Sequence, residues 1–102
     1  MWQAGRTMRV TEPQPRVLVV DDEDNVAFLI ASALRVAGYE TLVAATGTQA
    51  VEEVGRFAPH VIVLDVMLPD IDGFEVLRRV RAFGATTPVL FVTAKQATAD
   101  RV

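Results

Sequence analysis

Several residue types and patterns are absent from this sequence of 102 residues, and each absence excludes a class of protein. There is no cysteine, which excludes disulfides, thiol catalysis and zinc sites built on cysteine. No uninterrupted apolar run approaches the roughly 20 residues that a membrane-spanning helix needs. A net charge of −3 gives no broad positive surface for nucleic acid. Residues 1–16 lack the apolar segment of a secretory signal, so we expect a cytoplasmic protein.

The chain is expected to form one domain behind a short leader. With 102 residues, of which 51% are hydrophobic, it is long enough to bury a core. Pro13 and Pro15 end the leader, so we assign residues 1–15 to a flexible leader and residues 16–102 to the domain. The single histidine, His60, lies at the N-terminal end of a predicted strand, Val61–Asp65. The acidic residues described next lie at the C-terminal ends of the strands. We therefore expect no catalytic role for His60.

Two short apolar runs end in acidic residues. Val61–Leu64 runs into Asp65, and Val17–Val20 runs into Asp21 and Asp22. A short apolar run without alternation is typical of a strand buried on both faces, as in a parallel α/β sheet. Carboxylates at the ends of such strands lie at the edge where α/β proteins bind their ligands.

Strand and helix patterns alternate along the chain. They predict strands over 16–20, 39–44, 61–65 and 88–93, and helices over 24–37, 46–57 and 74–83. This alternation favours right-handed β-α-β units and a parallel sheet. Asp24 is predicted to cap the first helix, and Gly38 to follow its end. The expected inward residues are Val26, Leu29, Ile30, Ala33, Leu34 and Ala37 in the first helix, Ala50, Val51, Val54 and Phe57 in the second, and Phe74, Leu77 and Val80 in the third.

With the strand order 2-1-3-4, the C-terminal ends of the first, third and fourth strands lie close together. This order would bring four residues to one edge of the sheet: Asp21, Asp22, Asp65 and Thr93. Three neighbouring carboxylates repel one another unless a cation offsets their charge. Mg²⁺ suits such a site best, because it binds one or two carboxylates, water and a phosphate oxygen. Asp70 and Asp72, in the turn that follows, are expected to be solvated, and Gly73 to supply freedom in φ.

Three motifs together resemble one family. Asp21-Asp22 after the first strand, Leu64-Asp65 with Pro69 and Gly73, and Val92-Thr93-Ala94 are similar to the receiver domain of bacterial response regulators. The resemblance covers residues 16–102. It implies a flavodoxin-like (CheY-like) α/β fold with a parallel sheet.

The resemblance implies a role for each residue at this edge. Asp65 resembles the phosphoacceptor, and Asp21 and Asp22 resemble the pair that holds Mg²⁺. Met67 matches the position whose backbone carbonyl also binds the metal, and Thr93 resembles the switch hydroxyl. The resemblance further implies a sensor histidine kinase as phosphodonor, with DNA contacted only through a winged-helix effector domain outside this chain. Such a domain is not an enzyme beyond its own phosphorylation and dephosphorylation.

The chain departs from the family pattern at its C-terminal end. Receivers use a lysine at the end of a fifth strand, whereas Lys95 lies in the loop after the fourth strand. The fifth strand and the last helix are expected to be missing from these residues. Val89–Val92 would then form an apolar sheet edge without charge, and such an edge is prone to pairing. We therefore expect a homodimer or an exchange of elements between two copies.

Two other functions remain open from the sequence. Asp22-Glu23-Asp24 fits the D-x-D pattern of a haloacid-dehalogenase-type phosphatase, although that function leaves Asp65 and Pro69 unexplained. The second is a receiver-like interaction module that is never phosphorylated, because the family lysine is missing.

Overall fold

The computed structural model of the protein describes residues 13–92. In chain order, its elements are β1 (Arg16–Val20), α2 (Asp24–Val36), β2 (Glu40–Ala44), α3 (Gly47–Phe57), β3 (Val61–Asp65), α4 (Gly73–Ala82) and β4 (Val89–Val92). These bounds are close to the predicted ranges, and none of the described helices is long and apolar enough to cross a membrane. The predicted leader falls largely outside the described residues and stays a prediction.

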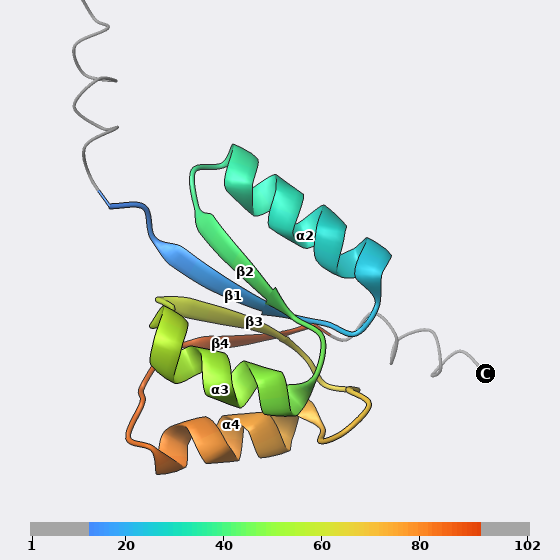
Figure 1. Cartoon of the computed structure of the whole chain (residues 1–102), viewed down its shortest axis with the longest axis vertical. Coiled ribbons are helices and arrows are strands. Elements are labelled where there is room, and N and C mark those ends of the chain that lie inside the picture. The colour runs from blue at the N-terminus through green and yellow to red at the C-terminus, as the bar shows by residue number, and fades with distance from the viewer. Residues whose placement is uncertain (1–12, 93–102) are drawn as a thin grey trace, which may run out of the picture.

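The strands form one parallel sheet in the order β2-β1-β3-β4 (Figure 1). Leu18 in the central strand β1 is paired with Leu42 on one side and with Ile62 on the other. At the other end of the sheet, Asp65 is paired with Val92. The predicted flavodoxin-like α/β fold and its order 2-1-3-4 are therefore confirmed.

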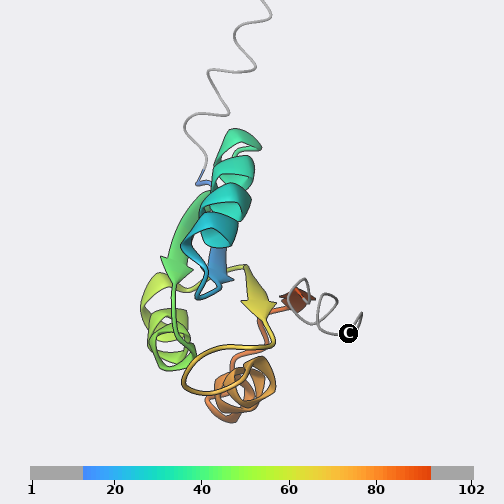
Figure 2. The same cartoon turned by 90° about the vertical axis from the view of Figure 1, so that its right-hand side faces the viewer.

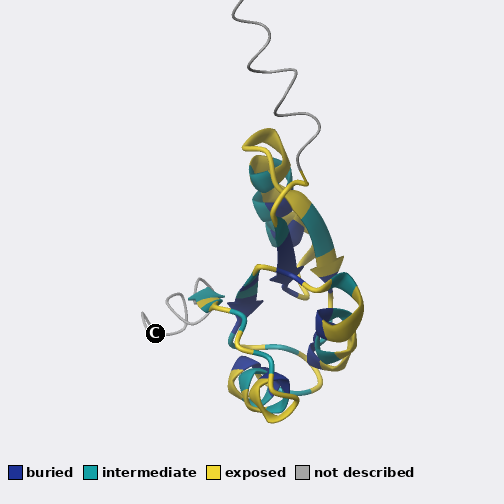
Figure 3. Ribbon diagram, turned by 90° about the vertical axis from the view of Figure 1, so that its left-hand side faces the viewer, coloured by how far each residue is buried: buried dark blue, intermediate teal, exposed yellow. Residues whose placement is uncertain are grey.

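The sheet separates two apolar layers, because successive side chains of a strand point to opposite faces. One layer lies between the sheet and the helices α3 and α4, and the other lies between the sheet and α2 (Figure 2). The strand residues of the first layer are Leu18, Val20, Ala44, Ile62 and Leu64, and those of the second are Val17, Val19 and Val63. Burial is concentrated in β1 and β3, while the outer surfaces of the helices are exposed (Figure 3).

Helix α2 packs on the sheet through a narrower apolar strip than predicted. Ala27 is buried against β1 and Ala31 is also buried, whereas Leu29 is 67% exposed and Ala33 and Ala37 are also exposed. The prediction that Leu29, Ala33 and Ala37 point inward was wrong, because the apolar residues of α2 extend around the helix beyond the face that contacts the sheet. The helix N-cap is Glu23 rather than Asp24. Gly38 follows the helix end at a φ of 105°, as its predicted position after the C-terminus requires.

Helix α4 also buries a face different from the predicted one. Val76 and Val80, one helical turn apart, are fully buried, whereas Phe74 is 59% exposed. The prediction that Phe74 points inward was wrong. The Phe74 ring instead lies against Phe91 of β4, with ring centroids 5.0 Å apart. Phe74 thereby covers part of the outer strand rather than the core between α3 and α4.

One face of β4 is open in the described part of the chain. Leu90 is 61% exposed, although its register partner Val63 contributes to the apolar layer beneath α2. An exposed leucine beside a half-buried valine extends the apolar surface of the sheet to its edge.

Candidate functional site

Three carboxylates meet where two neighbouring strands end. Asp21 follows β1 directly, Asp22 comes next, and Asp65 is the last residue of β3. Each of the three offers a carboxylate oxygen, and these oxygens all lie within 4.8 Å of one another. Asp21 and Asp65 are buried, and Asp22 is exposed. The structure therefore brings together three of the four residues predicted at this edge, while Thr93 lies outside the described residues.

Backbone groups orient the two buried carboxylates. Asp21 Oδ1 accepts a hydrogen bond of 2.9 Å from the backbone N–H of Glu23, at the start of α2. Asp65 Oδ1 accepts one of 3.1 Å from the backbone N–H of Met67. Each carboxylate is thus tied to the segment that leaves its own strand. Met67 lies in the loop that follows Asp65, at the position predicted to supply a carbonyl.

The donor set of this cluster fits a hard divalent cation. Two buried carboxylates and one exposed carboxylate place up to three negative charges within a few ångströms, and burying such charges without a counter-charge is unfavourable. Carboxylate oxygens are preferred ligands of Mg²⁺, which usually retains several water molecules. The exposed Asp22 leaves a solvent side on which such water could lie.

Gly73 allows the backbone to pass close behind Asp65. A Cβ atom on Gly73 would lie 2.7 Å from the carbonyl oxygen of Asp65 and 3.0 Å from the Cα of Val66. The backbone N–H of Gly73 donates a 2.8 Å hydrogen bond to the carbonyl of Val66. The φ of Gly73 is not positive, so the predicted need for freedom in φ was wrong. Glycine is required here for space.

Asp70 and Asp72 are exposed, as predicted, but both have structural contacts that the prediction missed. Asp72 is the N-cap of α4 and accepts a hydrogen bond of 2.9 Å from the backbone N–H of Glu75. The spacing Asp72-x-x-Glu75 is a helix-start pattern that could have shown this. Asp70 contacts the first turn of α3. The hydrogen bond from the Thr48 hydroxyl, with those from the N–H groups of Thr48 and Gly47, holds the pKa of Asp70 well below its usual range.

His60 lies at the opposite end of the sheet from the acidic cluster. Its Nδ1 accepts a hydrogen bond of 2.9 Å from the backbone N–H of Arg16, the first residue of β1. The Arg16 side chain donates in turn to the carbonyls of Phe57 and Ala58, at the end of α3. These contacts join the N-terminal ends of β1 and β3 to the C-terminal end of α3.

Comparisons with known proteins show the family of this chain. The response regulator receiver domain family matches residues 17–102. The chain belongs to this receiver family. The transcriptional regulatory protein TrcR of Mycobacterium tuberculosis is 44% identical to this receiver over 100 residues, which cover 98% of the chain and 39% of the relative. The alkaline phosphatase synthesis transcriptional regulatory protein PhoP of Bacillus subtilis is 39% identical over 87 residues, which cover 85% of the chain and 36% of the relative.

Solved receiver structures share the fold. The receiver domain of the Francisella response regulator 1452 superposes with a TM-score of 0.76 at 33% identity, covering 85% of this chain and 72% of that one. The chemotaxis protein CheY4 of Vibrio cholerae superposes with a TM-score of 0.74 at 28% identity, covering 87% and 79%. The receiver spans about two fifths of the length of the curated relatives. Membership of this family does not favour the haloacid-dehalogenase-type phosphatase that Asp22-Glu23-Asp24 suggested.

Proposed function

We propose that this receiver accepts a phosphoryl group on Asp65 from a sensor histidine kinase, in the presence of Mg²⁺, within a two-component signalling system. The observation that carries the proposal is the meeting of the Asp65 carboxylate with Asp21 and Asp22 within 4.8 Å, in a chain of the receiver family. Asp65 ends a buried strand, so its position is fixed by the core rather than by a mobile loop.

The chemistry requires a carboxylate nucleophile and charge compensation. An oxygen of Asp65 attacks the phosphorus, the new O–P bond forms as the bond to the donor breaks, and the leaving group keeps that electron pair. The backbone N–H of Met67 holds Asp65 Oδ1 and so restricts the rotation of the carboxylate during attack. Mg²⁺, held by Asp21, Asp22, Asp65 and the Met67 carbonyl, would neutralise the charge of the incoming group.

The output of the domain is proposed from its relatives. TrcR and PhoP are named transcriptional regulatory proteins, so we propose that phosphorylation here regulates transcription in the cytoplasm. DNA would be contacted through an effector domain outside these residues. Thr93 would act as the switch hydroxyl, donating a hydrogen bond to the phosphoryl group on Asp65.

Labelling with a small phosphodonor tests the proposed function. Incubation with acetyl phosphate and Mg²⁺ is expected to add one phosphoryl group per chain, seen by intact mass, and the label should be lost in base. Steady release of phosphate, with no labelled protein, would instead indicate a phosphatase. Absence of both label and release would indicate an interaction module that is not phosphorylated, and would contradict the proposal.

Asp22→Asn is expected to weaken Mg²⁺ binding by about tenfold or more, since even residues that only support metal ligands contribute that much. In the presence of a chelator the same variant should melt at a higher temperature than the parent, because one of three clustered negative charges is gone. Calorimetric titration with Mg²⁺ and thermal melts in EDTA measure the two effects.

Asp24→Asn is the matched control for this substitution. Asp24 is exposed and lies in the first turn of α2, outside the acidic cluster. It should leave the Mg²⁺ affinity unchanged. Equal Mg²⁺ affinity of the parent and the Asp22→Asn variant would remove Asp22 from the metal site.

A further inference from the structure

The loop between β3 and α4, residues 66–72, begins beside the acidic cluster and carries Met67. The backbone N–H of Met67 donates to Asp65 Oδ1. The loop is closed at its base, because the Gly73 N–H donates to the carbonyl of Val66. Exposed loop segments move unless they are held by further contacts, and Met67 is itself 50% exposed. Leu68 and Ile71 pack against the core, so the position of the Met67 backbone depends on its own hydrogen bond, on this packing and on the polar contacts that hold the rest of the loop.

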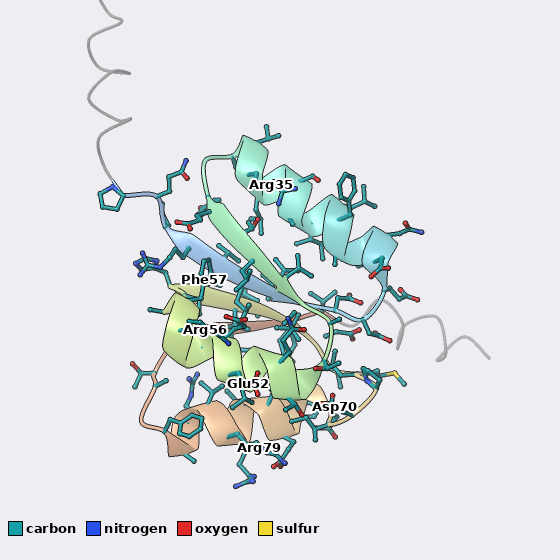
Figure 4. The ribbon with its side chains drawn as sticks, in the orientation of Figure 1. Arg35, Glu52, Arg56, Phe57, Asp70 and Arg79 are labelled. Atoms are coloured by element: carbon teal, nitrogen blue, oxygen red, sulfur yellow. The ribbon has the colours of Figure 1, made fainter. Side chains whose placement is uncertain are left out.

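Asp70 fastens this loop to α3. Its Oδ1 accepts a 2.8 Å hydrogen bond from the backbone N–H of Gly47. Its Oδ2 accepts hydrogen bonds from the backbone N–H and the hydroxyl of Thr48, at 2.9 and 2.5 Å. Figure 4 shows Asp70 beside the N-terminal end of α3. The contact joins residues 23 positions apart in the sequence, so it links two separate segments rather than closing a local turn.

Gly47 and Ile71 pack closely together beside this polar contact. A Cβ atom on Gly47 would overlap the Cγ1 atom of Ile71 and lie 3.0 Å from the Ile71 carbonyl oxygen. Ile71, the neighbour of Asp70, thus occupies the space that glycine leaves at the start of α3. Asp70 is therefore held by hydrogen bonds from both Gly47 and Thr48, and Ile71 fits closely against Gly47.

We propose that Asp70 is a positioning residue for the acidic site: by holding the 66–72 loop against α3, it keeps the Met67 carbonyl where Mg²⁺ binds. The inference rests on the function proposed above, because it concerns metal bound at Asp21, Asp22 and Asp65. An ionised carboxylate suits this contact, since it accepts several hydrogen bonds and is favoured at the positive end of a helix. Asp70 would not touch the metal, and its effect would pass through the loop.

Asp70→Ala is expected to raise the dissociation constant of Mg²⁺ by about tenfold, the lower part of the range for groups that orient metal ligands. Asp70→Asn keeps an oxygen that can accept from Gly47 or Thr48, so its effect should be smaller. Thr46→Ala is the matched control, because the Thr46 hydroxyl caps the same helix through the backbone N–H of Gln49. It should lower the melting temperature without changing Mg²⁺ affinity.

Calorimetric titration of all variants at one protein concentration, below their melting temperatures, distinguishes the possible results. If Asp70→Ala does not fold, Thr48→Ala removes the hydroxyl bond alone and should still weaken Mg²⁺ binding. Unchanged affinity in the Asp70 variants, or an equal loss in Thr46→Ala, would overturn the positioning role and leave the proposed function intact. A parent that binds no Mg²⁺ would overturn the proposed function and this inference with it.

Discussion

Asp65→Asn is expected to reduce labelling by acetyl phosphate to background. An amide is a far weaker nucleophile than a carboxylate, and no mixed anhydride with phosphate can form at the altered side chain. The substitution preserves the size of a side chain that is only 3% exposed, so the fold should persist. Intact mass after incubation with acetyl phosphate and Mg²⁺ measures the effect, with circular dichroism as the test of folding.

Asp72→Asn is the matched control for the acceptor. Asp72 also lies near the C-terminal end of β3 in the sequence, seven residues after Asp65. It caps α4 by accepting a hydrogen bond from the backbone N–H of Glu75 and does not belong to the acidic cluster. Asparagine is also a good N-cap, so this variant should be labelled as the parent is. Label that persists on Asp65→Asn would show that another residue is the acceptor.

A polypeptide of residues 1–102 is expected to self-associate through β4. Leu90 is 61% exposed on this outer strand, and edge strands that lack charge pair readily with other strands. Covering a few hundred Å² of apolar surface would contribute several kcal/mol, at about 25 cal/mol per Å². Size-exclusion chromatography with light scattering should therefore show a dimer or larger species.

Leu90→Lys should shift that polypeptide toward monomer, because a lysine at a sheet edge opposes pairing. Val36→Lys introduces the same charge at a residue that is 90% exposed near the end of α2, and it should leave the association unchanged. A monodisperse monomer with a steep cooperative denaturant transition, already in the parent, would contradict association through β4.

The features that the sequence predicts well are those that depend on short runs of neighbouring residues. The buried runs Val17–Val20 and Val61–Leu64 identify the two central strands, because continuous apolar runs of that length suit strands covered on both sides. Parallel pairing of these neighbours then places Asp21 and Asp65 together, since their strands end at the same edge of the sheet. The geometry of the acidic cluster thus follows from local patterns and one topological rule.

The features that the sequence did not reveal depend on contacts between distant segments. Asp70 looks like an ordinary turn residue until α3 is placed beside it, because its partners Gly47 and Thr48 belong to another part of the chain. The exposure of Leu29 and Phe74 depends on where each helix contacts the sheet. Helical periodicity gives the apolar side of a helix but not the width of its contact.

The pairing of β1 has a consequence for how the chain folds. Its two partners come from different distances along the sequence, with Val17 opposite Thr41 on one side and opposite Val61 on the other. None of the strand pairs within residues 13–92 is a hairpin, since parallel neighbours need a crossover between them. Contacts between distant residues close large loops and make folding slow. During synthesis the central strand can therefore gain its second neighbour only after the chain up to Asp65 has left the ribosome.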